Sequence, residues 1–155
     1  MKNMILCADF EKRFESTIIK SAFSQSTEGF SSTILFGPSG CGKTTTLRCL
    51  AGLEKPEKGH ISWNNDVWFD SASGIFVSPQ KRKTGFLFQD YALFPFMTVA
   101  QNIAYGMEDL THKQVLEFME RFRIDELANR MPNEISGGQR QRVALGRAIV
   151  REPKV

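Results

Sequence analysis

The spacing of hydrophobic and polar positions divides the chain into a first part rich in predicted strands and a second part rich in predicted helices. Short apolar runs and alternating segments that are bounded by turn residues are typical of β-strands. Such segments occupy residues 4–10, 17–23, 33–36, 61–63, 67–69, 75–77 and 85–88. Asn64, Asn65 and Asp66 suit the turn of a hairpin between two of these strands.

Apolar residues at helical spacing predict the remaining elements. In the helix predicted at residues 43–51, Leu47, Leu50 and Ala51 are expected to face inward, and Gly52 is suited to end the helix. Further helices are predicted at residues 98–105, after a capping-box pattern at 111–114, from Asp125, and at 136–151. A predicted strand, a loop and a predicted helix follow one another at residues 33–51, and this succession indicates an α/β protein.

Composition is that of an ordinary globular protein of one domain. The chain has 155 residues, of which 41% are hydrophobic and 24% charged, and its net charge of +3 is too small to argue for nucleic acid. The densest basic run, residues 81–83, is interpreted as a solvated turn. Cys7, Cys41 and Cys49 show no metal-ligand spacing and no evident pairing, which favours a reducing compartment. No targeting segment or membrane span is expected, so the chain is predicted to be cytosolic.

Residues 37–44 read G-P-S-G-C-G-K-T and match the phosphate-loop pattern G-x-x-x-x-G-K-[ST] at every fixed position. Glycines let the backbone approach a ligand closely, and successive N–H groups can then surround phosphate oxygens. Lys43 is expected to reach the β- and γ-phosphates, and the Thr44 hydroxyl to bind Mg²⁺. The predicted nucleotide-phosphate site consists of Gly37, Pro38, Ser39, Gly40, Cys41, Gly42, Lys43, Thr44 and Thr45.

A second helix start, I-S-G-G-Q at residues 135–139, is also suited to bind an anion. Ser136 and Gln139 fit a capping box. Gly137 and Gly138 each cost the helix about 1 kcal/mol relative to alanine, which suggests that something must approach this backbone closely. A serine hydroxyl and free N–H groups at a helix N-terminus form an anion site. The alternative interpretation is a helix that is simply well capped.

With these motifs in place, the chain resembles the ATP-binding subunit of an ABC (ATP-binding cassette) transporter. Residues 37–45 resemble the Walker A loop, and residues 135–139 resemble the signature L-S-G-G-Q, with Ile135 in place of leucine. Phe88-Gln89-Asp90 resembles the Q-loop.

The resemblance implies a P-loop NTPase (RecA-like) core with an N-terminal antiparallel β part and an inserted helical subdomain. A single cassette domain, residues 1–155, would divide into a β-rich phosphate-loop core at 1–88, a helical subdomain at 89–135 and the signature helix at 136–155.

The resemblance also implies a mechanism. Two such domains dimerise head to tail, and each ATP, with its Mg²⁺, is held between the Walker A loop of one domain and the signature of the other. Besides the Walker A residues, the implied nucleotide contacts are Ser136, Gly137, Gly138 and Gln139. Lys43 and Gln89 would be catalytic, and Thr44 and Gln89 would bind the metal.

Phe14 stands at the position where the family has an aromatic residue that stacks on adenine. A phenylalanine that only packs in the core is the alternative interpretation of this residue.

A cellular role follows from the same resemblance. The subunit would be cytoplasmic and peripheral on the inner face of the cell membrane, bound to transmembrane permease subunits. A solute-binding protein would be an indirect partner, and no direct contact with nucleic acid is expected. Residues 70–89, 93–95 and 102–106 are similar to bacterial importers of oxyanions, molybdate or tungstate above all, although sulfate, iron, polyamine and sugar importers share most of these segments.

The sequence departs from the family pattern near its end. In the family, an apolar strand and an Asp-Glu pair (Walker B and the catalytic base) follow the signature helix, whereas this sequence ends at Val155. Asp9 and the pair Asp125-Glu126 are the nearest candidates, and neither is a convincing replacement. We therefore expect the N-terminal part of a longer ATPase, which binds nucleotide but is inactive in hydrolysis on its own. The alternatives are a non-catalytic nucleotide-binding fragment and a soluble ABC ATPase that acts on nucleic acid.

Overall fold

The structure, a computed structural model, describes residues 4–14, 17–105 and 112–155. The chain forms two compact units, the first made of residues 1–84 with Val155 and the second of residues 85–154. The second unit includes the predicted signature helix together with the helices that precede it. The boundaries expected from the sequence, at residues 88 and 135, stay a prediction.

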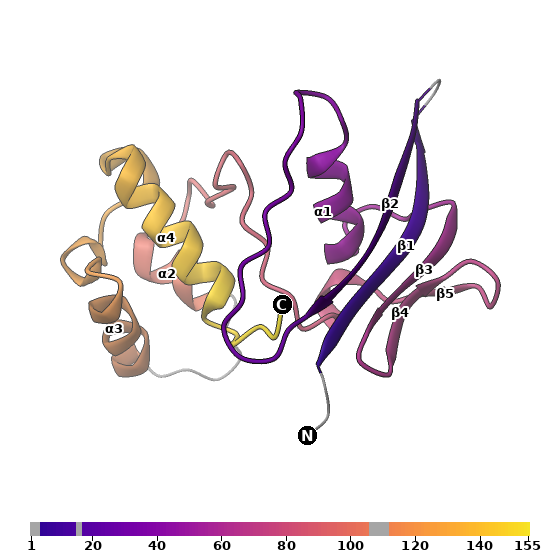
Figure 1. Ribbon diagram of the computed structural model, residues 1–155. Helices are drawn as coiled ribbons and strands as arrows, with labels where there is room; N and C mark the ends of the chain where they lie inside the picture. The colour runs from indigo at the N-terminus through magenta and orange to yellow at the C-terminus, as the bar shows by residue number, and fades with distance from the viewer. Residues whose placement is uncertain (1–3, 15–16, 106–111) are drawn as a thin grey trace. The chain divides into compact units, whose positions relative to one another are not determined.

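The first unit is built on a five-stranded antiparallel sheet with the strand order β2-β1-β3-β4-β5 (Figure 1). Its strands are β1 (Ile5–Phe14), β2 (Thr17–Ser26), β3 (Lys58–Trp63), β4 (Asp66–Asp70) and β5 (Ile75–Phe76). One helix of this unit, α1 (Lys43–Ala51), lies against the sheet (Figure 1). The predicted hairpin between β3 and β4 is confirmed, and Asn64 in its turn has a positive φ of 55°.

Alternation along β1 decides which face of the sheet is covered. Leu6, Ala8 and Phe10 are buried, whereas Asp9 between them is exposed. Successive side chains of a strand point to opposite faces, so the even-numbered residues of β1 face the core. That core is formed by Leu6, Ala8, Phe10, Cys49, Ile61, Trp68 and Phe69. Since Cys49 belongs to α1, the helix packs on this face of the sheet.

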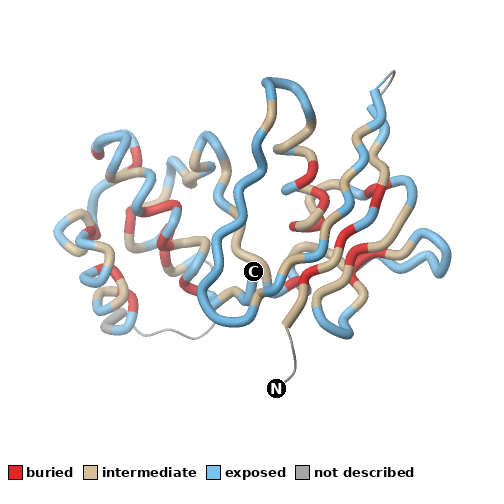
Figure 2. The backbone as a smooth tube through the Cα atoms, in the orientation of Figure 1, coloured by how far each residue is buried: buried red, intermediate tan, exposed pale blue. Residues whose placement is uncertain are grey.

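The strand predicted at residues 33–36 is wrong. These residues have no strand pairing, and Ile34 and Phe36 are 83% and 98% exposed; Figure 2 shows this run as exposed. A strand is held by hydrogen bonds to a neighbouring strand, and no described strand pairs with this segment. The strand predicted at residues 85–88 is wrong for the same reason. An apolar run indicates a preference for burial, but it supplies no partner strand.

Helix α1 buries only part of the predicted stripe: Ala51 is buried and Leu50 packs against the core, as predicted, but Leu47 does not. Thr46, Cys49 and Ala51 are buried, whereas Leu47 is 47% exposed. Cys49 and Leu50 follow Thr46 at i+3 and i+4, which is the spacing of one helix face, so the inward prediction is wrong for Leu47 alone. Gly52 ends the helix in the left-handed conformation with φ 77°, as predicted.

The second unit is helical. Its helices are α2 (Val99–Ala104), α3 (His112–Arg121) and α4 (Gly137–Ile149), joined by the 3₁₀ turns η2 (Asp125–Leu127) and η3 (Pro132–Glu134). Its core is formed by Val99, Ile103, Val115, Met119, Ile124, Ala128, Ile135, Val143 and Val150. Asp125 is the first residue of η2 and does not cap it, because Ile124 occupies the N-cap position.

The capping-box pattern predicted at residues 111–114 includes positions outside the described residues. In the part of the chain that the structure describes, no helix combines the length and apolar character needed to cross a membrane.

Candidate functional site

The phosphate loop owes its shape to glycines at two positions. Gly40 and Gly42 have φ values of 80° and 95°, which residues with a side chain rarely adopt. Gly42 is also the N-cap of α1, and a Cβ at this position would lie 2.8 Å from Ile19 of β2. Glycine therefore allows both the turn and the close contact with the sheet, and this contact fixes the start of α1 against β2.

The first turn of α1 offers free N–H groups. Among the described residues, no side chain caps this helix, and none accepts a hydrogen bond from the N–H groups of Lys43 and Thr44. The first N–H groups of a helix have no partner within the helix and stand at the positive end of its dipole. The start of α1 is therefore suited to bind an anion, and the adjoining loop brings further backbone groups.

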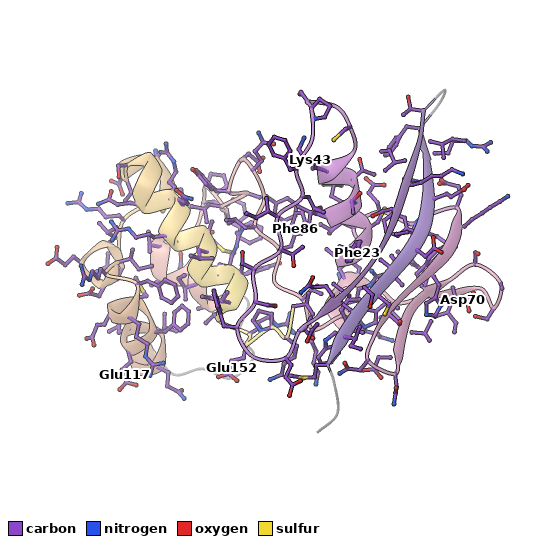
Figure 3. All side chains as sticks on the ribbon, viewed as in Figure 1. Phe23, Lys43, Asp70, Phe86, Glu117 and Glu152 are labelled. Carbon is purple, nitrogen blue, oxygen red and sulfur yellow. The ribbon has the colours of Figure 1, made fainter. Side chains whose placement is uncertain are left out.

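Lys43 adds a cation at this helix start. Its Nζ donates hydrogen bonds to the carbonyl oxygens of Gly37 and Pro38, both at 2.8 Å, and lies 3.6 Å from the Sγ of Cys41. Figure 3 labels Lys43 at the beginning of α1, where its side chain points to the loop. The ammonium group thus lies against the backbone at the start of the loop. Phosphate oxygens can replace the carbonyl oxygens of Gly37 and Pro38 as its acceptors.

The other predicted loop residues are accessible. Pro38, Ser39, Cys41 and Thr44 are exposed, and Thr45 is half-buried. Within the described residues, no cluster of three or more His, Cys, Asp or Glu side chains is placed to hold a metal ion. A Mg²⁺ ion at this loop fits a different donor set, because Mg²⁺ commonly binds one or two protein oxygens together with phosphate oxygens and water. The Thr44 hydroxyl is exposed at the start of α1 and is a protein oxygen of this kind, while its binding to Mg²⁺ stays a prediction.

The geometry of the sheet places Phe14 on the same face as the phosphate loop. Ile19, which contacts Gly42, pairs with Lys12 across β1 and β2, and Phe14 pairs with Thr17. Residues two apart in a strand share a face and lie about 7 Å apart. Phe14 is 43% exposed, and the Lys12 ammonium lies 5.3 Å from the centre of its ring. The ring is therefore accessible on this face, while its stacking on adenine stays a prediction.

The signature helix α4 starts with the predicted capping box. The Ser136 Oγ accepts a hydrogen bond from the Gln139 backbone at 3.3 Å, and the Gln139 Oε1 accepts one from the Ser136 backbone at 2.8 Å. A Cβ added to Gly138 would meet nothing within 4 Å, and one added to Gly137 would meet only the Arg140 side chain at 4.0 Å. Local packing among the described residues therefore gives no reason for the two glycines, and both backbone positions are open.

Gln89 lies on an exposed turn of the second unit. The turn is closed by a hydrogen bond from the Tyr91 backbone to the Phe88 carbonyl at 3.0 Å. The Arg147 Nη2 donates to the Tyr91 carbonyl at 2.9 Å, and the guanidinium lies 5.3 Å from the centre of the Phe94 ring. Burial lowers the pKa of Arg147. Since Arg147 belongs to α4, it ties the Gln89 turn to the signature helix.

Asn102 fixes the segment that follows the Gln89 turn. It is fully buried, and its Nδ2 donates to the carbonyls of Phe94, Met97 and Thr98 at 3.0–3.1 Å. Its Oδ1 accepts from the Phe94 backbone at 2.9 Å. Sequence reasoning missed both Asn102 and Arg147. The available signal was a polar residue on the apolar stripe of a helix, as at Asn102 between Val99 and Ile103.

A loop shaped by glycine, a lysine against its backbone and an uncapped helix start beside a sheet define the P-loop class of nucleotide-binding domains. The family model described as ABC transporter matches residues 23–155. The chain therefore belongs to the ABC transporter family, and its fold is that of the family's ATPase cassette.

Known proteins agree with this assignment. The trehalose/maltose import ATP-binding protein MalK of Thermococcus litoralis is 52% identical over 128 residues, which cover 79% of this chain and 34% of that protein. The molybdenum import ATP-binding protein ModC of Pseudomonas savastanoi pv. phaseolicola is 44% identical over 127 residues, covering 79% and 35%. The dimeric ATP-binding cassette MJ0796, in a post-hydrolysis state with ADP and Pi, superposes with a TM-score of 0.66 at 26% identity, covering 97% of this chain and 71% of that one.

The chain spans about a third of the length of these two curated relatives. Both relatives are import ATP-binding proteins, but their names give different cargoes. Both relatives therefore support a likeness to importers. Molybdate, the solute expected from the sequence, is only one of the solutes that the relatives' names give.

Proposed function

We propose that this chain is the ATP-binding part of a subunit that powers the import of a solute through a membrane permease. The observation that carries the proposal is the uncapped start of α1, with the Lys43 ammonium lying on the loop carbonyls of Gly37 and Pro38. This arrangement has the hydrogen-bond donors and the positive charge that binding of a nucleoside triphosphate requires. The likeness to two import ATP-binding proteins supports the transport role.

Each predicted residue has a proposed role at this site. The loop N–H groups and Lys43 bind the β- and γ-phosphates, and Thr44 binds Mg²⁺, which neutralises phosphate charge. Phe14 stacks on adenine from the end of β1. Gln89 senses the metal or the attacking water and transmits the change to the permease.

For hydrolysis, we propose that the 155 residues bind nucleotide but are inactive in turnover on their own. A general base must lie within hydrogen-bonding reach of the attacking water. Asp9 alternates along β1 with the buried Ala8 and Phe10, so its side chain points to the face of the sheet opposite α1. Asp9 is therefore not placed to serve the phosphate loop. Steady turnover of Mg-ATP by the chain, abolished by Lys43→Ala, would contradict this part of the proposal.

We further propose that the site is completed by a second nucleotide-binding subunit, arranged head to tail. Ser136 and Gly138 of one subunit would then contact the γ-phosphate bound by the other. The dimeric state of the MJ0796 cassette supports this arrangement. The same proposal places the subunit in the cytoplasm, held at the inner face of the membrane by permease subunits and served indirectly by a solute-binding protein.

For the cargo, we propose an oxyanion such as molybdate or tungstate, on the strength of residues 70–89 and the likeness to ModC. A sugar is the second candidate, favoured by the 52% identity to MalK. Uptake of radiolabelled molybdate and of maltose by source cells that lack this gene separates the two. Loss of maltose uptake with normal molybdate uptake would overturn the oxyanion assignment.

Calorimetric titration of the chain with Mg-ATP, ADP, AMP and inorganic pyrophosphate tests the nucleotide site. We expect ATP and ADP to bind far more tightly than AMP, because AMP lacks the β-phosphate that the loop surrounds. Pyrophosphate should also bind, since the loop contacts only phosphates. Equal affinities for ATP and AMP, or no binding of ATP, would contradict a phosphate-loop site.

A further inference from the structure

The helix that follows the phosphate loop is anchored at its far end by one buried arginine. Arg82 is only 3% exposed, although Lys81 and Lys83 on either side of it are exposed. The sequence interpretation of residues 81–83 as a solvated turn is therefore wrong for the central residue. The two lysines are solvated, and the arginine between them is part of the core of the first unit.

The guanidinium of Arg82 joins three segments of the first unit. Its Nη1 donates to the carbonyls of Cys49 and Leu50 in α1, at 2.8 and 2.7 Å. Its Nε donates to the Val77 carbonyl at 2.9 Å, and its Nη2 to the Trp68 carbonyl of β4 at 3.3 Å. All four acceptors are backbone oxygens, so Arg82 binds the main chain of the helix directly to that of the sheet.

Arg82 also lies against aromatic rings. The centres of the Trp68 and Phe76 rings are 5.6 and 5.4 Å from its central carbon. A Cβ on Gly52, the last residue of the helix cap, would lie 2.7 Å from the Arg82 Nε. The arginine is thus enclosed between the end of α1 and the sheet. A guanidinium is planar and carries five N–H donors, which suits this position better than any other side chain.

At the end of α1, the backbone cap binds two carbonyls, since Gly52 donates to Cys49 at 3.1 Å and Leu53 to Arg48 at 2.9 Å. Arg82 adds donors to Cys49 and Leu50. The last carbonyls of a helix have no partner within the helix, and they carry the negative end of its dipole. Burial lowers the pKa of Arg82 to about 10, so the group still carries its charge at neutral pH. The positively charged Arg82 therefore hydrogen-bonds the carbonyls of Cys49 and Leu50. It also interacts favourably with the negative end of the helix dipole, whose positive end lies at the phosphate loop.

The two ends of α1 are held by different means. Its start rests on Ile19 of β2 through Gly42, and its end is held by Arg82. The helix has nine residues and is therefore a rod about 14 Å long. If the far end is released, the rod can turn about the contact at Gly42, and the N–H groups of its first turn change direction.

We propose that Arg82 is a positioning residue of the nucleotide site, which holds α1 so that its first N–H groups and Lys43 converge on the phosphates. The inference rests on the proposed nucleotide site and deepens it. Arg82 lies at the opposite end of the helix from the loop, so it acts through α1 and does not contact the nucleotide.

Three variants of the complete chain test the proposal. R82M removes the charge and the donors, and R82K keeps the charge but loses the planar fork. The control R48M removes an arginine of the same helix, whose guanidinium binds the partly exposed carboxylate of Glu54 at 3.2–3.3 Å. Calorimetry gives the dissociation constants for Mg-ATP and for pyrophosphate, at a temperature at which circular dichroism shows each variant to be folded.

We expect R82M to weaken the binding of Mg-ATP and of pyrophosphate about tenfold or more, because small misplacements of binding groups have effects of this size. R82K should weaken the binding of both ligands by a smaller factor. R48M should stay within about twofold of the wild type, because a surface ion pair contributes little. Loss of stability alone does not change the dissociation constant of folded molecules. Weaker binding by folded R82M and R82K therefore distinguishes positioning from stabilisation.

Unchanged affinity in R82K and R82M, with only a lower melting temperature, would overturn the inference and leave the proposed nucleotide site intact. Failure of the wild type to bind Mg-ATP would overturn both. Should R82M not fold, R82K decides: weaker binding that is not seen in R48M supports positioning, and wild-type affinity overturns it.

Discussion

Two helices of this protein begin in glycine-rich turns, and their first turns are completed in opposite ways. Helix α1 starts at Gly42, which has no side chain to cap it, and no described residue accepts a hydrogen bond from the N–H groups of Lys43 and Thr44. Helix α4 starts at Ser136, whose side chain and backbone exchange hydrogen bonds with Gln139. The N-terminus of α1 therefore offers N–H donors to a ligand. At the N-terminus of α4, the capping box already satisfies part of the backbone hydrogen bonding.

The difference suggests two ways of binding the same kind of anion. In the proposed nucleotide site at α1, the loop would surround the phosphates, and Lys43 would add a positive charge. At α4, the capping box holds the Ser136 side chain in place as an acceptor, and its O–H can still donate outward. Open space above Gly137 and Gly138 leaves that start accessible. We therefore expect α1 to bind a nucleotide by itself, and α4 to contact a phosphate that another subunit presents.

The variant Lys43→Ala tests the uncapped N-terminus of α1 (the open start) most directly. Of all the variants, it is expected to have the largest effect. A charge-assisted hydrogen bond contributes about 1.5–3 kcal/mol, so the affinity for Mg-ATP should fall about 10- to 150-fold. Lys81→Ala, which removes an exposed lysine of the same unit, is the control. Calorimetric titration measures both variants. Equal affinity in Lys43→Ala and wild type would mean that the nucleotide binds elsewhere.

The glycines of the open start provide the next test, by a comparison of Gly42→Ala with Gly40→Ala. Both positions have positive φ, and such strain costs about 1–3 kcal/mol in a residue with a side chain. Only Gly42 also lies against Ile19, whereas a Cβ on Gly40 meets nothing within 4 Å. Urea unfolding should therefore show the larger loss for Gly42→Ala.

The additional substitution Ile19→Ala should restore part of the stability lost in Gly42→Ala, because it removes the atoms that a Cβ would meet. Equal losses in the two glycine variants would show that the contact with β2 has no energetic weight.

The self-capped start is tested by Ser136→Ala, with Thr98→Ala as its match. Thr98 and Gln101 form the same capping box at the start of α2. Loss of a serine or threonine cap costs about 1 kcal/mol, so both variants should lower the free energy of unfolding of the second unit by similar amounts. Neither should change the affinity of the monomeric chain for Mg-ATP. A weaker affinity in Ser136→Ala alone would show that the signature contacts the nucleotide of its own subunit.

The features that the sequence predicted correctly depend on residues close together in the chain. The hairpin turn at Asn64, the capping box of Ser136 and Gln139, and the helix end at Gly52 are each decided within a few residues. The tight turn at Gly40 and Gly42 is also local, since these glycines act through their own backbone conformation, whereas phosphate binding by the loop stays a prediction. Local chemistry is visible in a sequence because both partners lie in one short window.

The features that the sequence missed depend on distant partners. The apolar run at residues 33–36 matches a strand in composition, but strand pairing requires a neighbour that no local pattern specifies. Arg82 appeared to be one of three solvated basic residues, yet its acceptors come from Cys49, Leu50, Trp68 and Val77. Neither outcome follows from periodicity, because each is decided by which segments meet in space.

The smallest expected effect concerns Cys49, on the buried stripe of α1. Burial raises the pKa of its thiol to about 11 from an ordinary 9.0. Between pH 9 and 11 the unfolded chain loses this proton while the folded chain keeps it, so the free energy of unfolding should fall as the pH rises. The effect of this thiol should act on the first unit, because Cys49 belongs to α1.

Tryptophan fluorescence separates the units, because the two tryptophans of the chain, Trp63 and Trp68, both lie in the first unit. Urea unfolding followed by this fluorescence should show a decrease in stability above pH 9 that is less steep in Cys49→Ala. The matched variant Cys41→Ala, which changes an exposed thiol, should keep the wild-type slope. The slope is the informative quantity, because the cavity left by Cys49→Ala lowers stability at every pH. Identical slopes in all three proteins would mean that the thiol of Cys49 is not protected by the packing of α1 on the sheet.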